Sequence, residues 1–233
     1  IISIENSKKF VNSFFDKSVT KGKLTREEAD LALSRITYSQ KMVDLDQTKY
    51  IVEAATENLE LKQKIFHELD HIAPQDAILA TNTSSISISK IAAATKRPEN
   101  VIGLHFMNPV PVMQLVEIIP GLRTSSNTLT TSLDLAHEMG KQTVQSTDYP
   151  GFIANRILMP YINEAAFALQ EGIASVEDID KAMKLGTNVP MGPLSLADFI
   201  GLDTCLSIMN VLHEEIGDSK YRPAYILQKY VDA

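Results

Sequence analysis

The chain has 233 residues and a formal net charge of −7, and 44% of its residues are hydrophobic and 22% charged. This composition is that of one or two folded domains with a buried core, and it excludes a disordered chain, a collagen-like fibre and a disulfide scaffold. The net negative charge disfavours nucleic acid as a partner. No window approaches the roughly 20 apolar residues of a membrane span, so we expect no membrane partner.

Ten glycines are scattered singly along the chain, and no two of them are closer than six positions. These residues therefore contain neither a G-x-G-x-x-G turn nor a Walker-type phosphate loop, the two glycine patterns that hold the phosphates of nucleotides. Taken alone, the glycine pattern argues against a nucleotide-binding enzyme.

The start of the chain has the pattern of a strand end followed by two helices. Residues 1–4 form an apolar tetrapeptide that is typical of the end of a strand, and helical spacing of apolar residues begins at Phe10. Thr25 and Glu28 stand in the positions of a capping box, which predicts the start of a second helix. Because the last residues, 225–233, stop inside another helical pattern, we expect a chain truncated at both ends.

The middle of the chain alternates between short apolar runs and helical patterns. The predicted strands are Tyr50 to Ala54, Ala77 to Ala80, Val101 to Phe106, Gln114 to Ile119 and Gln142 to Gln145. The predicted helices between them are Leu59 to His71, Ile88 to Ala94 and Leu129 to Met139. This alternation predicts an α/β fold in which helices pack on the faces of a sheet.

The pattern changes at Pro150 and Gly151, because neither residue favours continuing a strand. From Phe152 onward only helical patterns occur, over Val176 to Leu185, for example. We therefore predict two domains, an α/β domain over residues 1–147 and an all-helical domain over residues 148–233.

The most unusual segment joins two predicted strands through a loop with two prolines, Pro109 and Pro111. His105 closes the first of these strands and Glu117 lies in the second, and the prolines force the backbone to redirect between them. If the loop brings Glu117 beside His105, the carboxylate fixes the imidazole tautomer and leaves the other nitrogen as an oriented base. The alternative is a histidine that ends a strand and a glutamate that faces solvent.

Polar side chains also follow two other predicted strands. The run Thr81 to Ser85 comes directly after the second strand, and Glu57 follows the first, with Lys62 about one helical turn later. Ligands of open α/β sheets bind beyond the carboxyl ends of the strands, so these side chains are candidates for holding a substrate or cofactor. The alternative is a purely structural turn between a strand and a helix, in which Ser84 or Ser85 is the N-cap of the helix.

One polar residue stands at the start of the helical part, where Asn155 lies within an otherwise apolar helix. A buried amide needs hydrogen-bond partners, so Asn155 either bonds locally or reaches toward the first domain. The turn Met191 to Leu194 precedes another helix, and we interpret it as a structural connection.

At these residues the sequence resembles the 3-hydroxyacyl-CoA dehydrogenase family. The resemblance extends from about Tyr50 to Tyr230, and HFMNPVPVM and GFIANR are its most specific motifs. The matching stretches are IVEAATENLELKQKIF, ILATNTSSISIS, GLHFMNPVPVMQLVEII, DYPGFIANRILMPYINEA, DIDKAMKLGTNVPMGPLSLADFIGLDT and LHEEIGDSKYRP.

The resemblance implies roles for five polar residues. In that family a histidine–glutamate pair performs the acid–base work, which makes His105 the base for the substrate 3-hydroxyl and Glu117 its partner. The serine and asparagines that contact the substrate oxygen and the nicotinamide correspond to Ser84, Asn108 and Asn155. We expect Ser84 and Asn155 to belong to the catalytic set, Ser84 and Asn108 to contact the cofactor, and all three to contact the substrate.

The family also implies a cofactor, a fold and an assembly. Its cofactor-contacting glutamate and lysine correspond to Glu57 and Lys62, its cofactor is NAD, and no metal is implied. Its fold is a Rossmann-type domain followed by a helical domain that forms the contact of a homodimer. The family opens with a strand and a G-x-G-x-x-G turn, which these residues lack, so we expect an incomplete NAD-binding domain and weak or no NAD binding by these 233 residues alone.

The function that follows is NAD-dependent oxidation of (3S)-3-hydroxyacyl-CoA, with 3-hydroxybutyryl-CoA as the expected short-chain substrate. The first alternative is a dehydrogenase-derived protein that has lost dinucleotide binding and serves as an acyl-CoA-binding or scaffolding module. The second is a relative that acts on a substrate without CoA, such as a free 3-hydroxy acid. We expect a soluble protein of the cytoplasm or of an organelle matrix.

Overall fold

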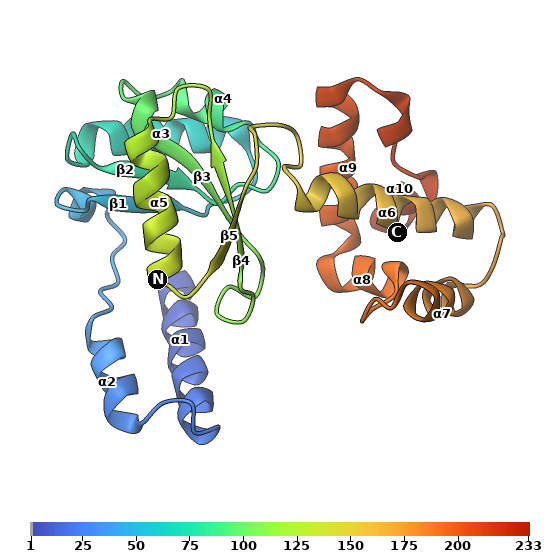
Figure 1. The fold of residues 1–233 in the computed structure, drawn as a ribbon, viewed down its shortest axis with the longest axis horizontal. Coiled ribbons are helices and arrows are strands. Elements are labelled where there is room, and N and C mark those ends of the chain that lie inside the picture. The colour runs from blue at the N-terminus through green and yellow to red at the C-terminus, as the bar shows by residue number, and fades with distance from the viewer. Residues whose placement is uncertain (1) are drawn as a thin grey trace. The chain divides into compact units, whose positions relative to one another are not determined.

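The computed structural model describes residues 2–233 (Figure 1). The chain divides into two compact units. The first unit contains the residues up to Thr48 together with Ile72–Pro74, and the second contains Lys49–His71 and Gln75–Ala233. The predicted α/β domain of residues 1–147 is thus divided between the two units, while the predicted helical domain lies in the second. The boundary between domains after residue 147 stays a prediction.

The first unit is a pair of helices, α1 (Ile2–Thr20) and α2 (Arg26–Ser34), followed by the 3-10 helix η1 (Met42–Leu45). The capping box is confirmed, because the Thr25 hydroxyl accepts from the backbone N–H of Glu28 and the Glu28 carboxylate accepts from that of Thr25. The expected strand end is wrong for residues 2–4, which belong to α1, and residue 1 lies outside the described residues. A short apolar segment without a neighbouring strand to pair with continues as the first turn of the helix.

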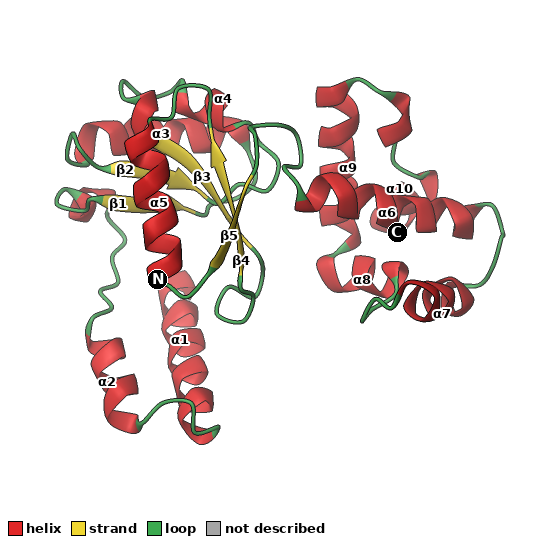
Figure 2. Ribbon diagram, viewed as in Figure 1, coloured by secondary structure: helices red, strands yellow, loops and turns green. Residues whose placement is uncertain are grey.

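The second unit begins with a five-stranded sheet in the order β1-β2-β3-β4-β5 (Figure 2). The strands are β1 (Tyr50–Glu53), β2 (Ile78–Thr81), β3 (Val101–Phe106), β4 (Leu115–Pro120) and β5 (Gln142–Gln145). Strands β1 to β3 are parallel, β4 runs antiparallel to β3, and β5 is parallel to β4. All five strands therefore match the prediction to within a residue or so at each end, and the α/β fold is confirmed.

Helices cover both faces of the sheet, with α5 on one face and α3 and α4 on the other (Figure 1). Their bounds are α3 (Leu59–Ile72), α4 (Ile88–Ala92) and α5 (Ser126–Glu138). Ile102 and Leu104 pack in one buried cluster with Ala136 of α5. Gly103 points to the opposite face, where a Cβ atom would lie 2.7 Å from Ile88 Cδ1, so only glycine lets α4 approach β3 this closely.

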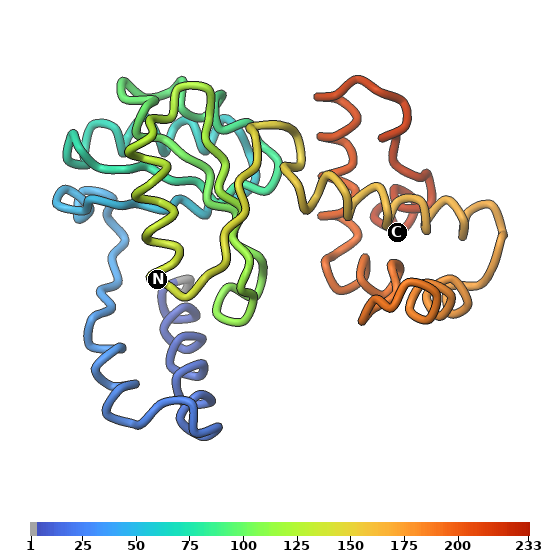
Figure 3. Tube along the Cα trace, viewed as in Figure 1, coloured from blue at the N-terminus to red at the C-terminus, as the bar shows by residue number. Residues whose placement is uncertain are grey.

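The rest of the second unit is helical, and Figure 3 follows its trace from yellow to red. Its helices are α6 (Ala154–Gln170), α7 (Val176–Thr187), α8 (Pro193–Ile200), α9 (Leu202–Ile216), the 3-10 helix η3 (Ser219–Tyr221) and α10 (Tyr225–Asp232). Their core is built around Met159, Met209 and Leu212. Of the helices described, none is by itself long and apolar enough to cross a membrane, and α8 and α9 pass that test only as a pair bent by 99°.

The turn before α8 is held by a buried carboxylate, that of Asp180 in α7. Its oxygens accept from the backbone N–H groups of Leu194 at 2.8 Å and Ser195 at 2.9 Å, which have no partner inside the helix. Gly192 passes so close that a Cβ atom there would lie 2.3 Å from Asp180 Cγ. The turn Met191 to Leu194 is therefore a structural connection, as the sequence predicted, and the Asp180 carboxylate stabilises it.

We expect Gly192→Ala to lower the free energy of unfolding by about 3 kcal/mol, because the added methyl group displaces the Asp180 carboxylate from two helix N–H groups. Chemical denaturation monitored by circular dichroism measures this change. Gly186→Ala is the matched control, since Gly186 lies in α7 with open space where a Cβ atom would be added, and alanine there gains about 0.5 to 1 kcal/mol of helix propensity. Equal stability of the two variants would contradict the assignment.

Candidate active site

His105 and Glu117 are directly opposite each other on neighbouring strands, β3 and β4. The His105 Nδ1 atom lies 2.7 Å from Glu117 Oε2, and both side chains are buried. The antiparallel register of the two strands produces this pairing, because the proline-containing loop returns the chain beside the strand it left. The juxtaposition expected from the sequence is therefore present, and the alternative of a solvent-facing glutamate is wrong.

The second oxygen of Glu117 is bound by the first residues of the helical part. Oε1 accepts from the backbone N–H groups of Ile153 at 2.9 Å and Ala154 at 2.8 Å, where α6 begins. Burial raises the pKa of Glu117, but the hydrogen bonds from His105, Ala154 and Ile153 and the charge of His105 outweigh it and hold the pKa below its ordinary value. Glu117 is therefore ionised at neutral pH.

An ionised carboxylate accepts hydrogen bonds and donates none, so the His105 nitrogen that faces Glu117 carries a proton. In the neutral imidazole this leaves the lone pair on Nε2, for which residues 2–233 provide no hydrogen-bond partner. The ring is also held from the side by Phe152, whose centroid lies 5.8 Å away. The arrangement is an oriented base with its outer nitrogen available.

The approach to α6 has an uncommon backbone. Gly151 and Phe152 have φ angles of +77° and +50°, and Phe152 is the less usual case because a bulky side chain rarely adopts the left-handed region. This turn brings the Phe152 ring to His105 and the next two N–H groups to Glu117. Gly151 also passes close to Leu212, because a Cβ atom on Gly151 would lie 2.9 Å from Leu212 Cδ2. The sequence indicated a break here but not these contacts.

The polar run after β2 forms a tight turn around the carboxylate of Glu57. Glu57 Oε1 accepts from the Thr83 hydroxyl at 2.6 Å and from the backbone N–H groups of Ser84 and Ser85, each at 2.9 Å. Neither Ser84 nor Ser85 caps α4, since Ser87 takes that position. The Ser84 hydroxyl makes no hydrogen bond within the described residues, so it is available to a ligand.

Lys62 is fully buried and surrounded by acceptors. Its Nζ atom lies 2.8 and 3.0 Å from the two carboxylate oxygens of Glu53, 3.1 Å from the carbonyl of Ala55 and 3.7 Å from Glu57 Oε2. Three acceptors therefore occupy the three donors of the ammonium group, and a direct contact with a cofactor requires the exchange of one of them. Glu53, which also accepts from Thr81, was not anticipated from the sequence.

The two asparagines occupy different environments. Asn155, in the first turn of α6, donates from Nδ2 to the backbone carbonyl of Ser84 at 3.1 Å, so it reaches from the helical part to the α/β part. Asn108 is exposed in the loop after β3, and its peptide bond to Pro109 is cis. The start of α6 thus connects the predicted site residues, because Ile153 and Ala154 bind Glu117 and the next residue, Asn155, binds Ser84, whereas Asn108 makes no hydrogen bond with any of them within the described residues.

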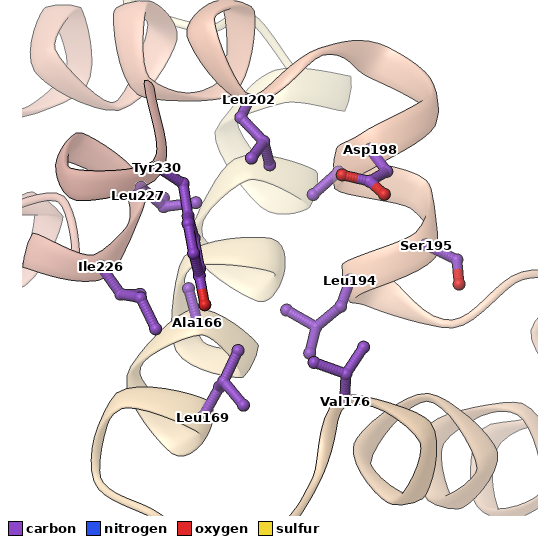
Figure 4. Close-up of a pocket in the computed structure, with 11 residues that line it drawn as sticks. Ala166, Leu169, Val176, Leu194, Ser195, Asp198, Leu202, Ile226, Leu227 and Tyr230 are labelled. Carbon is purple, nitrogen blue, oxygen red and sulfur yellow. The ribbon is translucent and has the colours of Figure 1, made fainter. Parts of the chain in front are cut away.

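Two cavities lie near these parts of the chain. One of about 280 Å³ is lined by Glu57, Ser85 and Lys90 on the sheet side and by Glu215 of α9, to which Lys90 is paired at 2.6 Å. A larger one of about 380 Å³ lies among the helices, where Figure 4 shows mainly aliphatic side chains around Tyr230. The larger cavity contains none of the predicted site residues.

No group of three or more His, Cys, Asp or Glu side chains among residues 2–233 is arranged to hold a metal ion. The remaining features are an open α/β sheet, polar groups at its carboxyl edge and an oriented histidine base paired with a buried carboxylate. Together they define an open-sheet α/β protein with a candidate acid–base site and a helical second part.

Comparisons with known proteins make this class specific. Residues 3–149 match the family model described as 3-hydroxyacyl-CoA dehydrogenase, NAD binding domain, and residues 151–233 match that of 3-hydroxyacyl-CoA dehydrogenase, C-terminal domain. The chain belongs to the 3-hydroxyacyl-CoA dehydrogenase family.

Individual relatives agree with this family over most of the chain. A probable 3-hydroxybutyryl-CoA dehydrogenase of Bacillus subtilis is 54% identical over 217 residues, which are 93% of this chain and 76% of the relative. A 3-hydroxybutyryl-CoA dehydrogenase of Bradyrhizobium diazoefficiens is 54% identical over 223 residues, which are 96% and 76% of the two chains. The crystal structure of (S)-3-hydroxybutyryl-CoA dehydrogenase from Ralstonia eutropha superimposes with a TM-score of 0.92 at 50% identity, covering 94% of this chain and 78% of that one.

Proposed function

We propose that the protein oxidises short-chain (3S)-3-hydroxyacyl-CoA, with 3-hydroxybutyryl-CoA as the preferred substrate, to the 3-oxo thioester with NAD. The observation that carries this proposal is the buried His105–Glu117 pair, whose outer nitrogen has no partner within the described residues. The names of the relatives from Bacillus subtilis and Ralstonia eutropha support the choice of substrate.

His105 is the general base of the proposed reaction. Its Nε2 atom takes the proton of the substrate 3-hydroxyl, and the imidazolium that forms faces the ionised carboxylate of Glu117 at 2.7 Å. Because Glu117 is already bound by two backbone N–H groups, it holds its position and charge while the ring changes protonation. The pair therefore stabilises the positive charge that develops on the ring.

Ser84 and Asn155 supply the polar contacts beside the base. The Ser84 hydroxyl, which has no partner within residues 2–233, is a donor for the substrate oxygen. Asn155 keeps its amide oxygen available while its Nδ2 atom is bound to the Ser84 carbonyl, so the two residues are held together. We assign both to orientation of the substrate 3-hydroxyl.

The residues at the carboxyl edge of the sheet fit the nicotinamide end of NAD. Glu57 and Ser84 lie beyond β1 and β2, and the Glu57 side chain is 34% exposed, so a polar ligand can reach it. We assign Glu57, Ser84 and Asn108 to contacts with the cofactor, and Lys62 to such a contact only where it exchanges one of its acceptors. NAD supplies the hydride acceptor when bound.

The direct test measures NADH formation by the full-length protein with (3S)-3-hydroxybutyryl-CoA. We expect kcat/KM for the thioester to exceed that for free (3S)-3-hydroxybutyrate by at least about 100-fold, because binding energy of the remote CoA group assists the reacting carbon. The (3R)-thioester is the control and is expected to be inert. Binding of the thioester without NADH formation would instead favour an acyl-CoA-binding module, and faster oxidation of the free acid would favour a substrate without CoA.

The assembly and location of the protein belong to the same proposal. Several large apolar side chains of the helical part are more than two-thirds exposed, namely Ile157, Ile173, Leu185, Phe199 and Tyr225. Exposed apolar surface of this kind supports a homodimer formed through the helical part, which the molecular mass in solution tests. The relatives named above are bacterial, and on that ground we propose a cytoplasmic location.

A further inference from the structure

The Ser84 turn is built around a carboxylate that comes from another strand end. Glu57 Oε1 receives the Thr83 hydroxyl, the N–H groups of Ser84 and Ser85, and the Ser85 hydroxyl at 3.1 Å. Successive backbone N–H groups that converge on one anion form a nest, and the anion fixes their peptide planes. Since the backbone of Ser84 sets the direction of its Cα–Cβ bond, Glu57 fixes the position from which the Ser84 hydroxyl is presented.

A buried cation, shared with a second carboxylate, lies beside this anion. Lys62 Nζ lies 3.7 Å from Glu57 Oε2, and Glu53 anchors Lys62 through both carboxylate oxygens. The Lys62 and Glu53 side chains are only 1% and 3% exposed, so solvent does not compete with these bonds. Lys62 therefore attracts Glu57 electrostatically, at the carboxylate oxygen that the turn does not use, while its three N–H donors are bound to Glu53 and Ala55.

Thr83 is a buried residue that connects Glu57 to the backbone of the turn. It is fully buried, its hydroxyl donates to Glu57 Oε1 and it accepts from the backbone N–H of Ile86 at 3.0 Å. Because its side chain has no exposed surface, Thr83 touches neither substrate nor cofactor. Asn155 binds the turn from the outside, at the Ser84 carbonyl.

We propose that Thr83 and Glu57 are positioning residues that set the orientation of the Ser84 hydroxyl toward the reacting oxygen beside His105. For Glu57 this role is separate from any contact with the cofactor. The inference rests on the proposed function, in which Ser84 contacts the substrate, and it extends that function to a buried threonine with no ligand contact.

The test uses Thr83→Val, which keeps the side-chain shape and removes the hydroxyl. We expect kcat/KM for 3-hydroxybutyryl-CoA to fall by about tenfold or more, with the change mainly in kcat, because the misplaced Ser84 affects orientation in the transition state. Thr83→Ser keeps the hydroxyl and is expected to restore most of the activity. Thr128→Val is the matched control, since Thr128 is equally buried and its hydroxyl donates to the Glu99 carbonyl at 2.8 Å, outside the site.

A double-mutant cycle separates positioning from a general structural effect. If Thr83 acts through Ser84, Thr83→Val adds less than about twofold to the loss caused by Ser84→Ala. Multiplicative losses in the double variant would overturn the proposal, as would a Thr128→Val variant that loses as much kcat as Thr83→Val. Absence of activity in the wild-type protein would instead overturn the proposed function.

A spectroscopic measurement tests the turn itself without substrate or cofactor. Amide protons that donate to a carboxylate form short, charge-assisted hydrogen bonds and resonate downfield. We expect Glu57→Gln to move the Ser84 and Ser85 amide proton resonances upfield and to speed their exchange with solvent. Unchanged resonances in Glu57→Gln would overturn the assignment of Glu57 as the anion of the turn, whatever the activity of the protein.

Discussion

The His105→Gln variant is expected to lose about 1,000-fold in kcat while the KM for NAD stays within about threefold of the wild-type value. Glutamine has no nitrogen that accepts a proton at neutral pH, so the substrate 3-hydroxyl has no base in the variant. Its amide still fills part of the space between Glu117 and Phe152, which preserves the fold of the site. Steady-state kinetics of NADH formation measure the loss.

His137→Gln is the matched control for this experiment. His137 lies at the end of α5 and is exposed, and within residues 2–233 its ring makes one hydrogen bond, with the Thr143 hydroxyl at 3.1 Å. The same change of residue type there leaves kcat unaltered if the loss at His105 comes from the chemistry. Activity of His105→Gln equal to that of the wild type would remove His105 as the base.

Glu117→Gln is expected to lower kcat by about 100-fold or more and the free energy of unfolding by about 2 kcal/mol. The amide of glutamine replaces one carboxylate oxygen with a donor, so it no longer accepts from both His105 and the N–H groups of Ile153 and Ala154. It also fails to balance the imidazolium that forms during the reaction. Kinetics and chemical denaturation measure the two effects, and Glu138→Gln on the exposed end of α5 serves as control.

The stability effect depends on pH in a defined direction. The pKa of Glu117 in the folded protein lies below its ordinary value of 4.5, so the unfolded chain binds more protons between these two values. The stabilisation from this carboxylate is complete above pH 4.5 and is lost as the pH falls through the lowered pKa. The stability difference between wild type and Glu117→Gln should therefore be largest near neutral pH and shrink under acid conditions, and a constant difference from about pH 7 to about pH 3 would contradict it.

Several of the elements were predictable because their signals are local. The strand over Val101–Phe106 matches the prediction at both ends, and α3 differs by one residue, since apolar runs and helical periodicity depend on neighbours in sequence. The capping box of α2 was equally readable, because both partners lie within four residues of each other. The prediction was wrong for residues 2–4 because a short apolar segment does not indicate whether a strand lies beside it.

The contacts of the site were predictable only in part. The proline-containing loop indicated that His105 and Glu117 approach each other, and the structure shows the two atoms 2.7 Å apart. No local signal indicated that α6 supplies N–H groups to Glu117, or that Glu53 neutralises Lys62 across the strand end. Such contacts depend on how separate elements pack, and a sequence pattern does not record that packing.

The sequence by itself indicated which residues are candidates for the chemistry and on which elements they lie, because strand ends, prolines and family motifs are properties of short segments. It also determined that these residues contain no glycine turn for a pyrophosphate. Only the tertiary structure decided that Glu57 serves the Ser84 turn and that Lys62 is enclosed by acceptors. The reason is that a carboxylate or an ammonium group takes its role from the donors and acceptors around it, and here those come from strands and helices far apart in the chain.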